Sequence, residues 1–276
     1  MGKGSIGIFD SGYGGLTVLK DIVTLLPNYN YIYLGDNARS PYGSKSFDII
    51  YEYTKEAVEW LFNHNCNLVI LACNTASAKA LRKLQQEWLP IYYPNKKLLG
   101  VIRPTAELIG TKTNNKTLGI LGTKGTIKSC SYIKEIQNFF PEVAIYQQAC
   151  PLWVPFIEEG LIENHTLKEI IITDLQLLFN QNKDIQTVLL ACTHYPLIKN
   201  LLEDATEGKI KFISQGPIVA CSLKKYLERH SKLDKSLSKD GEQYFYTTDN
   251  ASSFEKRASL FYGKNIKAQK IKIALS

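Results

Sequence analysis

Two cysteines of this chain stand in nearly the same sequence context. Cys73 lies in LACNTASA (71–78), and Cys192 lies in LLACTHYP (189–196). In each motif an apolar run, typical of a buried strand, ends in Ala-Cys and is followed by polar residues that can begin a helix. A buried strand explains the leucines but not a thiol at its end. Because the positive end of a helix dipole stabilises a thiolate, both cysteines are candidates for acid–base or nucleophilic chemistry.

The residues that follow the two cysteines are polar. A single cysteine at the end of a strand is more often a small buried residue than a functional one, but two in matching contexts favour function. Asn74, Thr75 and Thr193 can cap the following helices or offer amide and hydroxyl groups to an anionic ligand. His194 directly follows the second motif, and an imidazole can poise a neighbouring thiol for proton transfer.

A glycine-rich segment near the N-terminus adds two further candidates. FDSGYGGLT (9–17) places Asp10 and Ser11 at the end of a predicted strand, followed by three glycines and a predicted helix. Glycines allow backbone amides to approach a carboxylate or a phosphate closely. The segment matches neither the dinucleotide-binding pattern nor the P-loop pattern, so a nucleotide site is only weakly indicated.

Two other segments hold polar residues outside the predicted strands and helices. In GDNARSPYGSKS (35–46), Tyr42 and Gly43 are candidates for ligand contact, and a plain turn is an equal alternative. Glu158 and Glu159 follow the proline-interrupted stretch ACPLWVPFI, and each taken alone is more typical of a solvated carboxylate.

The composition is typical of a globular protein without a membrane anchor. Of the 276 residues, 45% are hydrophobic, and no apolar run is long enough to cross a bilayer. The chain begins with a predicted strand rather than a secretory signal, so we expect a cytoplasmic protein. No C-x-x-C pair occurs, which argues against a zinc site and against thioredoxin-like chemistry. We expect free thiols, and we interpret the other four cysteines as packing residues: Cys66, Cys130, Cys150 and Cys221.

The positive charge is concentrated in the last quarter of the chain. The net charge is +7, and residues 199–276 hold fifteen Lys/Arg against nine Asp/Glu. A solvated basic surface is the simpler interpretation, because no nucleic-acid-binding motif accompanies the charge. We therefore expect neither nucleic acid as the main partner nor a membrane.

Short apolar runs alternate with helical patterns, which predicts a parallel α/β fold. One series of strands is expected at 5–9, 31–36, 68–72 and 98–102, and a second at 117–122, 143–149, 187–191 and 209–213. Helices are expected at 16–26, 47–62, 76–87, 127–140 and 167–178, and after Cys192 as far as about residue 204. Two late strands within 244–249 and 265–273 flank a helix near 252–262 and are expected to pack on the first series, after a surface loop at 233–244.

The two series resemble each other. IGIFDSGYGG is similar to LGILGTKGT, and the offset from Gly7 to Gly119 differs by only seven residues from the offset from Cys73 to Cys192. A diverged internal duplication accounts for this, although two ordinary strand ends are the alternative. We therefore predict two pseudo-symmetric parallel-sheet α/β domains with the active site in the cleft between them. The first comprises residues 1–98 plus 212–276 and carries Cys73; the second comprises 99–211 and carries Cys192.

Four ordered motifs resemble one known family. GIFDSGYGGLTVL, LGDNARSPYG, LACNTASA and LLACTHYPL are similar to the cofactor-independent glutamate racemases of the aspartate/glutamate racemase superfamily, and the match covers most of the chain. The resemblance implies a bacterial isomerase that supplies D-glutamate for peptidoglycan in cell-wall synthesis. It implies that Cys73 and Cys192 are catalytic, and that neither a cofactor nor a metal is used.

The resemblance also implies roles for the neighbouring residues. Asp10 would tune or orient Cys73, and His194 with Glu158 would do the same for Cys192. In the family the first cysteine takes the α-proton from D-glutamate and the second takes it from L-glutamate. The contacts to the amino acid would come from Asp10, Ser11, Tyr42, Gly43, Asn74, Thr75, Thr193 and His194.

Two positions depart from the family pattern. Arg103 in GVIRP replaces a commonly acidic residue, and SQGPIVA (214–220) replaces a late DSG-like turn. Neither alters a motif named above, so the differences bear on domain contacts, oligomer geometry or regulation rather than on catalysis.

A duplicated thiol suits a reaction that inverts a carbon centre. One base on one face tends to return the proton to the face it came from, whereas a thiolate on one face and a thiol on the other can invert the centre. The carbanion between the two transfers needs fixed N–H and O–H donors around the substrate carboxylate.

Three alternatives stay open at this stage. One is the same chemistry on aspartate or on several amino acids, since one methylene changes binding by only about 1–3 kcal/mol. Another is a non-catalytic binding protein that uses the basic C-terminal quarter. The third is a thiol redox protein. The small-molecule substrate is expected to be glutamate, and a homodimer is one option for the assembly.

Overall fold

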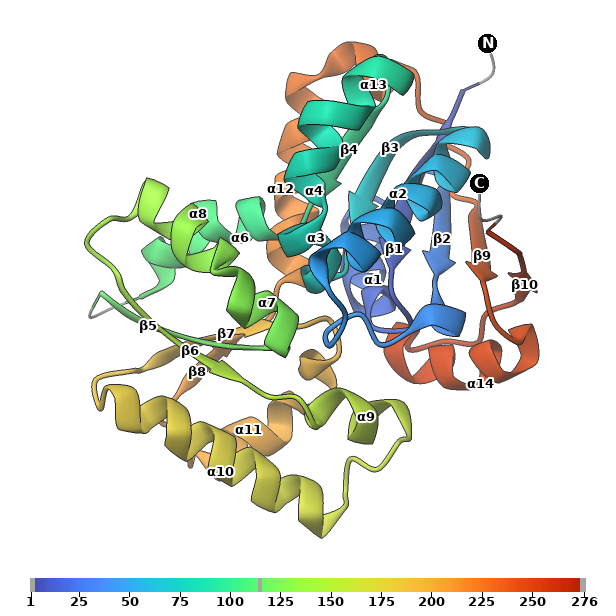
Figure 1. Cartoon of the computed structure of the whole chain (residues 1–276). Coiled ribbons are helices and arrows are strands. Elements are labelled where there is room, and N and C mark those ends of the chain that lie inside the picture. The colour runs from blue at the N-terminus through green and yellow to red at the C-terminus, as the bar shows by residue number, and fades with distance from the viewer. Residues whose placement is uncertain (1–2, 114–115, 274–276) are drawn as a thin grey trace.

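Two parallel β-sheets organise the chain in a computed structural model, which describes residues 3–113 and 116–273 (Figure 1). The larger sheet has six strands in the order β10-β9-β2-β1-β3-β4, and the smaller has four in the order β6-β5-β7-β8. The strands of the larger sheet are β1 (Ser5–Asp10), β2 (Tyr31–Gly35), β3 (Cys66–Leu71), β4 (Lys97–Gly100), β9 (Gln243–Thr247) and β10 (Ala268–Lys270). Those of the smaller sheet are β5 (Thr117–Gly122), β6 (Ala144–Ala149), β7 (Thr187–Ala191) and β8 (Lys211–Ile213).

Helices cover both faces of each sheet, which is why the central strands are apolar throughout. On the larger sheet, α1 (Gly15–Leu25), α12 (Gly216–Arg229) and α14 (Ala251–Tyr262) pack on one face, and α2 (Phe47–Asn63) packs on the other. The smaller sheet carries α9 (Trp153–Glu158), α10 (His165–Gln181) and α11 (Lys199–Ala205) on one face, and α6 (Ile102–Ile109) and α8 (Ser131–Phe139) on the other. The remaining helices are α3 (Asn74–Lys79), α4 (Leu81–Lys83), α5 (Leu89–Tyr92), α7 (Lys124–Ser129) and α13 (Ser231–Lys235).

The two sheets repeat the same arrangement of strands. The order β4-β3-β1-β2 in the first corresponds to β8-β7-β5-β6 in the second. The register also agrees, because Gly7 lies opposite Val69 in one sheet and Gly119 lies opposite Val188 in the other. Val69 lies in β3 and Val188 in β7, and one of the two cysteine motifs follows each of these strands. The arrangement predicted from the duplicated motifs, α/β with two parallel sheets, is therefore confirmed.

Two predicted helices are interrupted. Instead of one helix over 76–87, the chain forms α3 and α4, then a π-helical turn, η2 (Leu84–Trp88), before α5. Pro90, near the start of α5, has no N–H to donate, and the backbone N–H of Leu89 bonds to Leu84 O in the π pattern. The predicted helix at 127–140 is divided at Cys130, whose φ of 53° is left-handed and ends α7 before α8 begins.

Three helices, α6, α9 and α12, lie where none is predicted, and α13 overlaps a predicted loop. α6 follows β4, which ends at Gly100, so the predicted strand at 98–102 is too long. α12 buries Ile218, Val219, Leu223 and Leu227 along one side. The predicted surface loop at 233–244 begins inside α13.

The chain crosses between the sheets twice. The first crossing runs from β4 through α6 to β5, and the second runs from β8 into α12. The predicted boundaries after residue 98 and before residue 212 fall inside β4 and β8, and the division into domains stays a prediction. The late strand β9 pairs with β2, so the C-terminal segment returns to the first sheet as expected.

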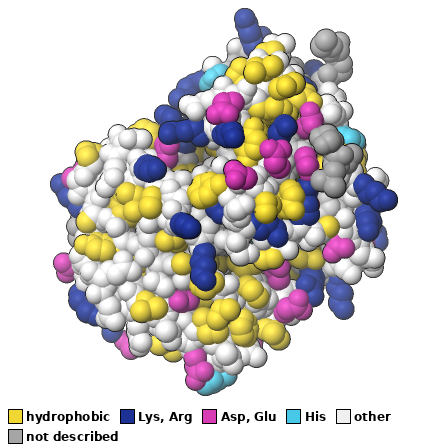
Figure 2. All heavy atoms as spheres, viewed as in Figure 1, with side chains coloured by type: hydrophobic (Ala, Val, Ile, Leu, Met, Phe, Trp, Pro, Cys, Tyr) yellow, Lys and Arg dark blue, Asp and Glu magenta, His cyan; other side chains and the backbone are white. Residues whose placement is uncertain are grey.

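The described residues form no helix that is long and apolar enough to cross a membrane. On the face drawn in Figure 2, Lys and Arg side chains are interspersed with apolar and acidic ones. This face therefore lends no support to a single basic binding patch.

The equivalent glycines of β1 and β5 offer a test of the packing. A methyl group at Gly119 would lie 2.9 Å from Leu178 Cδ2, and one at Gly7 would lie 3.0 Å from both Cys66 Sγ and Val69 Cγ2. Gly119→Ala and Gly7→Ala should each lower the free energy of unfolding by about 1–3 kcal/mol, because overpacking forces neighbours off their rotamers. Urea denaturation measures this. Midpoints equal to that of the native protein would contradict the close packing.

Candidate active site

Both cysteines lie just beyond the carboxyl ends of central strands, where sites form in parallel sheets. Cys73 precedes α3 as its N-cap residue, and its Sγ accepts a hydrogen bond from Ala76 N–H at 3.5 Å. Cys192 follows β7 and precedes a short 3-10 helix, η4 (Tyr195–Ile198), which leads into α11. The helix predicted after Cys192 therefore exists, but its first turn is 3-10.

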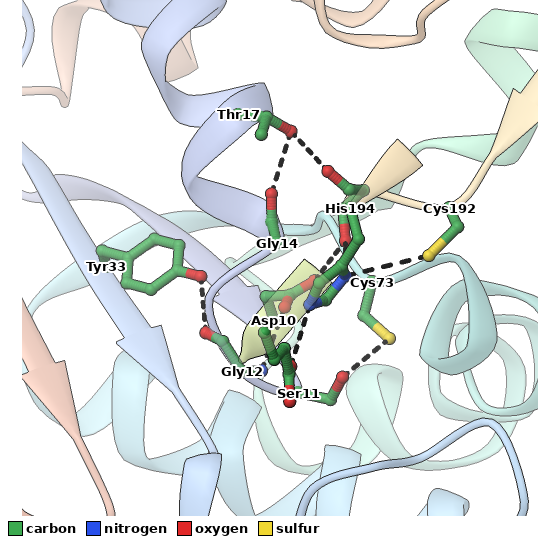
Figure 3. Close-up of polar contacts among 11 residues, drawn as sticks. Asp10, Ser11, Gly12, Gly14, Thr17, Tyr33, Cys73, Cys192 and His194 are labelled. Atoms are coloured by element: carbon green, nitrogen blue, oxygen red, sulfur yellow. Dashed lines mark hydrogen bonds and ion pairs between the residues drawn. The ribbon is translucent and has the colours of Figure 1, made fainter. Parts of the chain in front are cut away.

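A cavity of about 110 Å³ lies between the two halves and is lined by both thiols. Each cysteine is 5% exposed. Figure 3 shows the two sulfur atoms facing the same space, with Ser11 beside one and His194 close to the other. Every site residue predicted from the sequence lines this cavity except Asp10, which lies fully buried beside it.

Cys73 is surrounded by groups that disfavour its ionisation. Burial, together with the nearby Asp10 carboxyl, raises the pKa of the Cys73 thiol to about 12, although a hydrogen bond with Ser11 opposes this. The thiol donates to Ser11 Oγ at 3.5 Å. At neutral pH Cys73 is therefore held as a protonated thiol.

Asp10 is held by both halves of the molecule. Its Oδ1 accepts from Gly12 N–H at 3.0 Å, and its Oδ2 accepts from Thr193 Oγ1 at 3.4 Å. Burial raises the pKa of the Asp10 carboxyl, and the positive charge of His194 opposes that shift. Asp10 thus lies between the two thiol environments and is fixed relative to each.

Cys192 has a cation as its neighbour. His194 Nδ1 lies 3.8 Å from Cys192 Sγ, and its Nε2 lies 2.9 Å from Glu158 Oε1. Burial lowers the pKa of His194, but the hydrogen bonds and charges of Cys192 and Glu158 outweigh it and raise the pKa to about 10. His194 therefore brings a positive charge close to the Cys192 sulfur. The two thiols therefore experience opposite electrostatic surroundings.

Gly14 has a structural role that the sequence did not reveal. A methyl group there would lie 2.2 Å from Thr193 Oγ1 and 2.5 Å from His194 Nδ1. The carbonyl of Thr193 in turn accepts from Thr17 Oγ1 at 2.9 Å. The glycine lets the N-terminal loop approach the second cysteine motif, rather than serving only to expose amides to a ligand.

Several predicted contact residues already have protein partners. The Asn74 amide donates to Gln215 Oε1 at 2.7 Å and its Oδ1 accepts from Tyr132 OH at 2.5 Å, so its side chain is engaged. The Tyr42 hydroxyl donates to Asp36. These residues line the cavity without offering an unoccupied side-chain group.

Threonine hydroxyls gather where the two halves meet. Thr75 Oγ1 lies 3.0 Å from Thr123 Oγ1 and 3.5 Å from Thr126 Oγ1. The carbonyl of Gly43 accepts from Gly125 N–H at 2.9 Å, which ties the 35–46 loop to the start of α7. These hydroxyls surround the N-terminus of α7 at the edge of the cavity.

Some lining residues were not predicted. Thr123, Lys124, Cys150 and Val154 all line the cavity. The internal repeat could have located Thr123, because aligning Gly119 with Gly7 places Thr123 where the first half has Ser11. Cys150 is a buried residue of this wall, whereas the sequence suggested only packing.

Comparison with known proteins identifies one family. The model of the Asp/Glu/Hydantoin racemase family matches residues 6–221. A glutamate racemase of Sulfurihydrogenibium sp. is 38% identical over 270 residues, covering 98% of this chain and 97% of that protein. A glutamate racemase of Persephonella marina is 39% identical over 271 residues, covering 98% of each.

Solved structures agree with the sequence relatives. The glutamate racemase isoform RacE1 from Bacillus anthracis superimposes with a TM-score of 0.87 at 31% identity, covering 98% of this chain and 97% of that one. The glutamate racemase from Francisella tularensis in complex with D-glutamate gives 0.85 at 30% identity, covering 98% of each. An aspartate racemase from Picrophilus torridus gives 0.55 at 18% identity, covering 83% of this chain and 99% of that one, and shows likeness of fold alone.

The ion pair beside Cys192 gives a measurable expectation. Glu158→Gln removes the anion that stabilises the imidazolium, so the pKa of His194 should fall by roughly 1–3 pH units. Ring NMR signals followed against pH measure this, with the exposed His165 as internal control. The same titration curve for His194 in native and variant proteins would contradict the pairing.

The pair also makes stability depend on pH. Because the folded-state pKa of about 10 exceeds the ordinary 6.5, the charged pair stabilises the fold fully below pH 6.5, and this contribution is lost as pH rises through about 10. In Glu158→Gln, the free energy of unfolding should therefore fall less as the pH rises through about 10.

Proposed function

The chain belongs to the Asp/Glu/Hydantoin racemase family, and we propose that Cys73 and Cys192 are the two acid–base groups of its reaction. The activity is that of a glutamate racemase, an isomerase that interconverts L- and D-glutamate. The alternative of a non-catalytic binding protein is thereby set aside, and the relatives favour glutamate over aspartate.

One observation carries the assignment of the residues. Two thiols on equivalent strand ends line one small cavity. The acidic Asp10 lies near Cys73 and the cationic His194 lies near Cys192, so the charged neighbours of the two thiols have opposite signs. A reaction that removes a proton from one face of a carbon and returns one to the other needs such a pair. The same two sulfurs serve both directions by exchanging roles.

For L-glutamate, the scheme starts from a thiol at Cys73, which its surroundings favour, and from a thiolate at Cys192, which lies beside His194. This is the state that accepts L-glutamate. The Cys192 thiolate takes the α-proton, the electron pair of the C–H bond stays on the carbon, and the Cys73 S–H donates its proton to the opposite face. The product is D-glutamate, and the cysteines end with their protonation exchanged.

The carboxyl and imidazole groups tune the thiols in this scheme. His194, charged through Glu158, lowers the cost of a thiolate at Cys192. Burial, together with Asp10, favours the thiol form of Cys73, so that a proton is present there for donation to the substrate. Because the two thiols supply both proton transfers, no step of the proposal calls on a cofactor.

The carbanion requires donors aimed at the substrate carboxylate, where negative charge develops. Ser11, Thr75 and Thr193 bring hydroxyl groups to the cavity wall, and Asn74 stands at the N-terminus of α3. With the side chain of Asn74 engaged elsewhere, its contribution would come from the backbone N–H and the dipole of α3.

The biological setting follows from the family. The D-glutamate produced would enter peptidoglycan synthesis, and we therefore expect the enzyme in the bacterial cytoplasm. Assembly as a homodimer stays a prediction.

Replacing either cysteine tests the proposal. Cys73→Ala and Cys192→Ala should each lower kcat for racemisation by at least about 10²- to 10⁴-fold, the usual contribution of a positioned acid–base group. Circular dichroism at a glutamate band measures the rate, and far-UV spectra check the fold. Cys66→Ala, a buried cysteine of β3 outside the cavity, is the matched control and should retain activity. Near-native turnover by either cavity variant would exclude the two-thiol scheme.

Isotope incorporation tests the proton transfers directly. In D₂O and without added cofactor, glutamate that has been racemised should carry deuterium at the α-carbon, because the donated proton comes from a thiol that exchanges with solvent. Inversion without incorporation of deuterium would be incompatible with this route. A thiol count after turnover distinguishes the redox alternative, which requires loss of free thiols.

Substrate choice provides a further check. We expect kcat/KM for glutamate to exceed that for aspartate by about 10-fold or more, because one methylene in a closed pocket alters binding by roughly 1–3 kcal/mol. Parallel assays of both amino acids measure the ratio. Equal values would indicate a broad-specificity enzyme.

A further inference from the structure

Three buried side chains form a closed ring of hydrogen bonds next to Cys73. Asn74 Nδ2 donates to Gln215 Oε1 at 2.7 Å, Gln215 Nε2 donates to the Tyr132 hydroxyl, and Tyr132 OH donates to Asn74 Oδ1 at 2.5 Å. Each member donates once and accepts once within the ring. Thr105 sets the direction of the ring: its own proton goes to Val101 O, so it must accept from Gln215, and the Gln215 nitrogen therefore lies on that side.

The ring is shielded from water. Tyr132 is fully buried, and Asn74 and Gln215 are each 3% exposed. A buried amide that loses its partner keeps the cost of its desolvation, so the ring holds its members in one arrangement. Substrate would therefore meet an Asn74 whose orientation is already set by the protein.

Gln215 also joins the two crossings between the sheets. It stands at the start of α12, directly after the second crossing. Its Nε2 lies 3.0 Å from Thr105 Oγ1 and 3.5 Å from Val101 O, both on the first crossing. Thr105 is itself anchored, because its hydroxyl donates to Val101 O at 2.7 Å. One side chain thus ties both connecting segments to the residue after Cys73.

The position of the ring relates it to one thiol in particular. Asn74 is the first residue of α3, and Cys73 is the N-cap whose sulfur accepts from the same helix. Cys192 is served by a different set of contacts, through His194 and Glu158. A change in the ring should therefore shift Cys73 relative to the substrate carbon more than it shifts Cys192.

We propose that Gln215 is a positioning residue for Cys73: by closing the ring with Asn74 and Tyr132 while bonding to Thr105, it sets how Cys73 meets the α-carbon. The inference rests on the proposed function. It also gives a role to the SQGPIVA segment, which departs from the family pattern. Gln215 does not line the cavity and acts only through its neighbours.

The two proton transfers occur in series, so isotope effects can separate them. With α-deuterated D-glutamate, the effect on kcat/KM reports on proton removal by Cys73; with α-deuterated L-glutamate, it reports on removal by Cys192. Raising the barrier at Cys73 makes that step more fully rate-limiting. The isotope effect on kcat/KM measured with D-glutamate then rises, and the isotope effect measured with L-glutamate falls.

Gln215→Met removes the amide while keeping a side chain of similar length. It should lower kcat/KM by about 10- to 100-fold, the order of loss that follows from a small misplacement of a reacting group. The ratio of the D to the L isotope effect should rise above the native ratio. Tyr132→Phe, which removes one hydroxyl from the same ring at nearly constant volume, should shift the ratio in the same direction and keeps the test available if Gln215→Met does not fold.

Tyr31→Phe is the matched control. Tyr31 is also fully buried, and its hydroxyl donates to Leu26 O at 2.7 Å, but it begins β2 at the end of the sheet away from the cysteines. Its loss should lower the unfolding midpoint and leave the isotope ratio at the native value.

The outcomes separate this inference from the proposed function. If Gln215→Met and Tyr132→Phe both keep the native isotope ratio, the proposed role of the ring is overturned, whether or not activity falls. The two-thiol reaction would stand. A native protein that racemises glutamate without an α-deuterium isotope effect from either enantiomer, or that does not racemise it, would overturn the proposed reaction and the inference together.

Discussion

The hydrogen bond between His194 and Glu158 keeps a positive charge beside one thiol, while burial, together with the Asp10 carboxyl, keeps the other thiol protonated. This asymmetry gives two chemically identical groups different electrostatic surroundings, as the proposed reaction requires. It exists only because both sulfurs are buried, since water would screen the charges and equalise the two environments. The fold therefore has to exclude solvent and still leave room for a small substrate.

Parallel topology supplies the geometry. The carboxyl ends of β3 and β7 present their cysteines at the same kind of sheet edge, and the matching strand orders place the two edges on facing halves. Contacts across the interface then fix the spacing: Thr193 donates to Asp10, Thr75 meets Thr123, and Gly43 receives the N–H of Gly125. The hydrophobic core also continues from one half to the other, so the halves are not independent bodies joined by a linker.

Much of the fold could be predicted because the sequence repeats its own signals. The apolar runs at 117–122 and 187–191 correspond residue for residue to β5 and β7. Prediction was weaker where local backbone geometry decides, as at Cys130, whose left-handed conformation no propensity rule for cysteine anticipates. α12 was missed although its apolar residues recur at helical spacing, because Gly216 and Pro217 at its start are more typical of a turn.

The residues of the candidate site also divide into those that the motifs predicted and those that only the structure reveals. Residues next to the cysteines in sequence were found from the motifs, and every predicted residue but Asp10 lines the cavity. The partners of Asn74 could not be found in this way. Tyr132 and Gln215 are 58 and 141 positions away. The SQGPIVA segment that holds Gln215 stood out only as a departure from the family pattern, so only the tertiary fold shows that Gln215 contacts Asn74.

Gly14 couples the sequences of the two halves. Its α-carbon faces Thr193 and His194 in the other half and leaves no room for a Cβ. A larger residue here would displace these two side chains, so a substitution at Gly14 calls for compensating substitutions in the segment after Cys192.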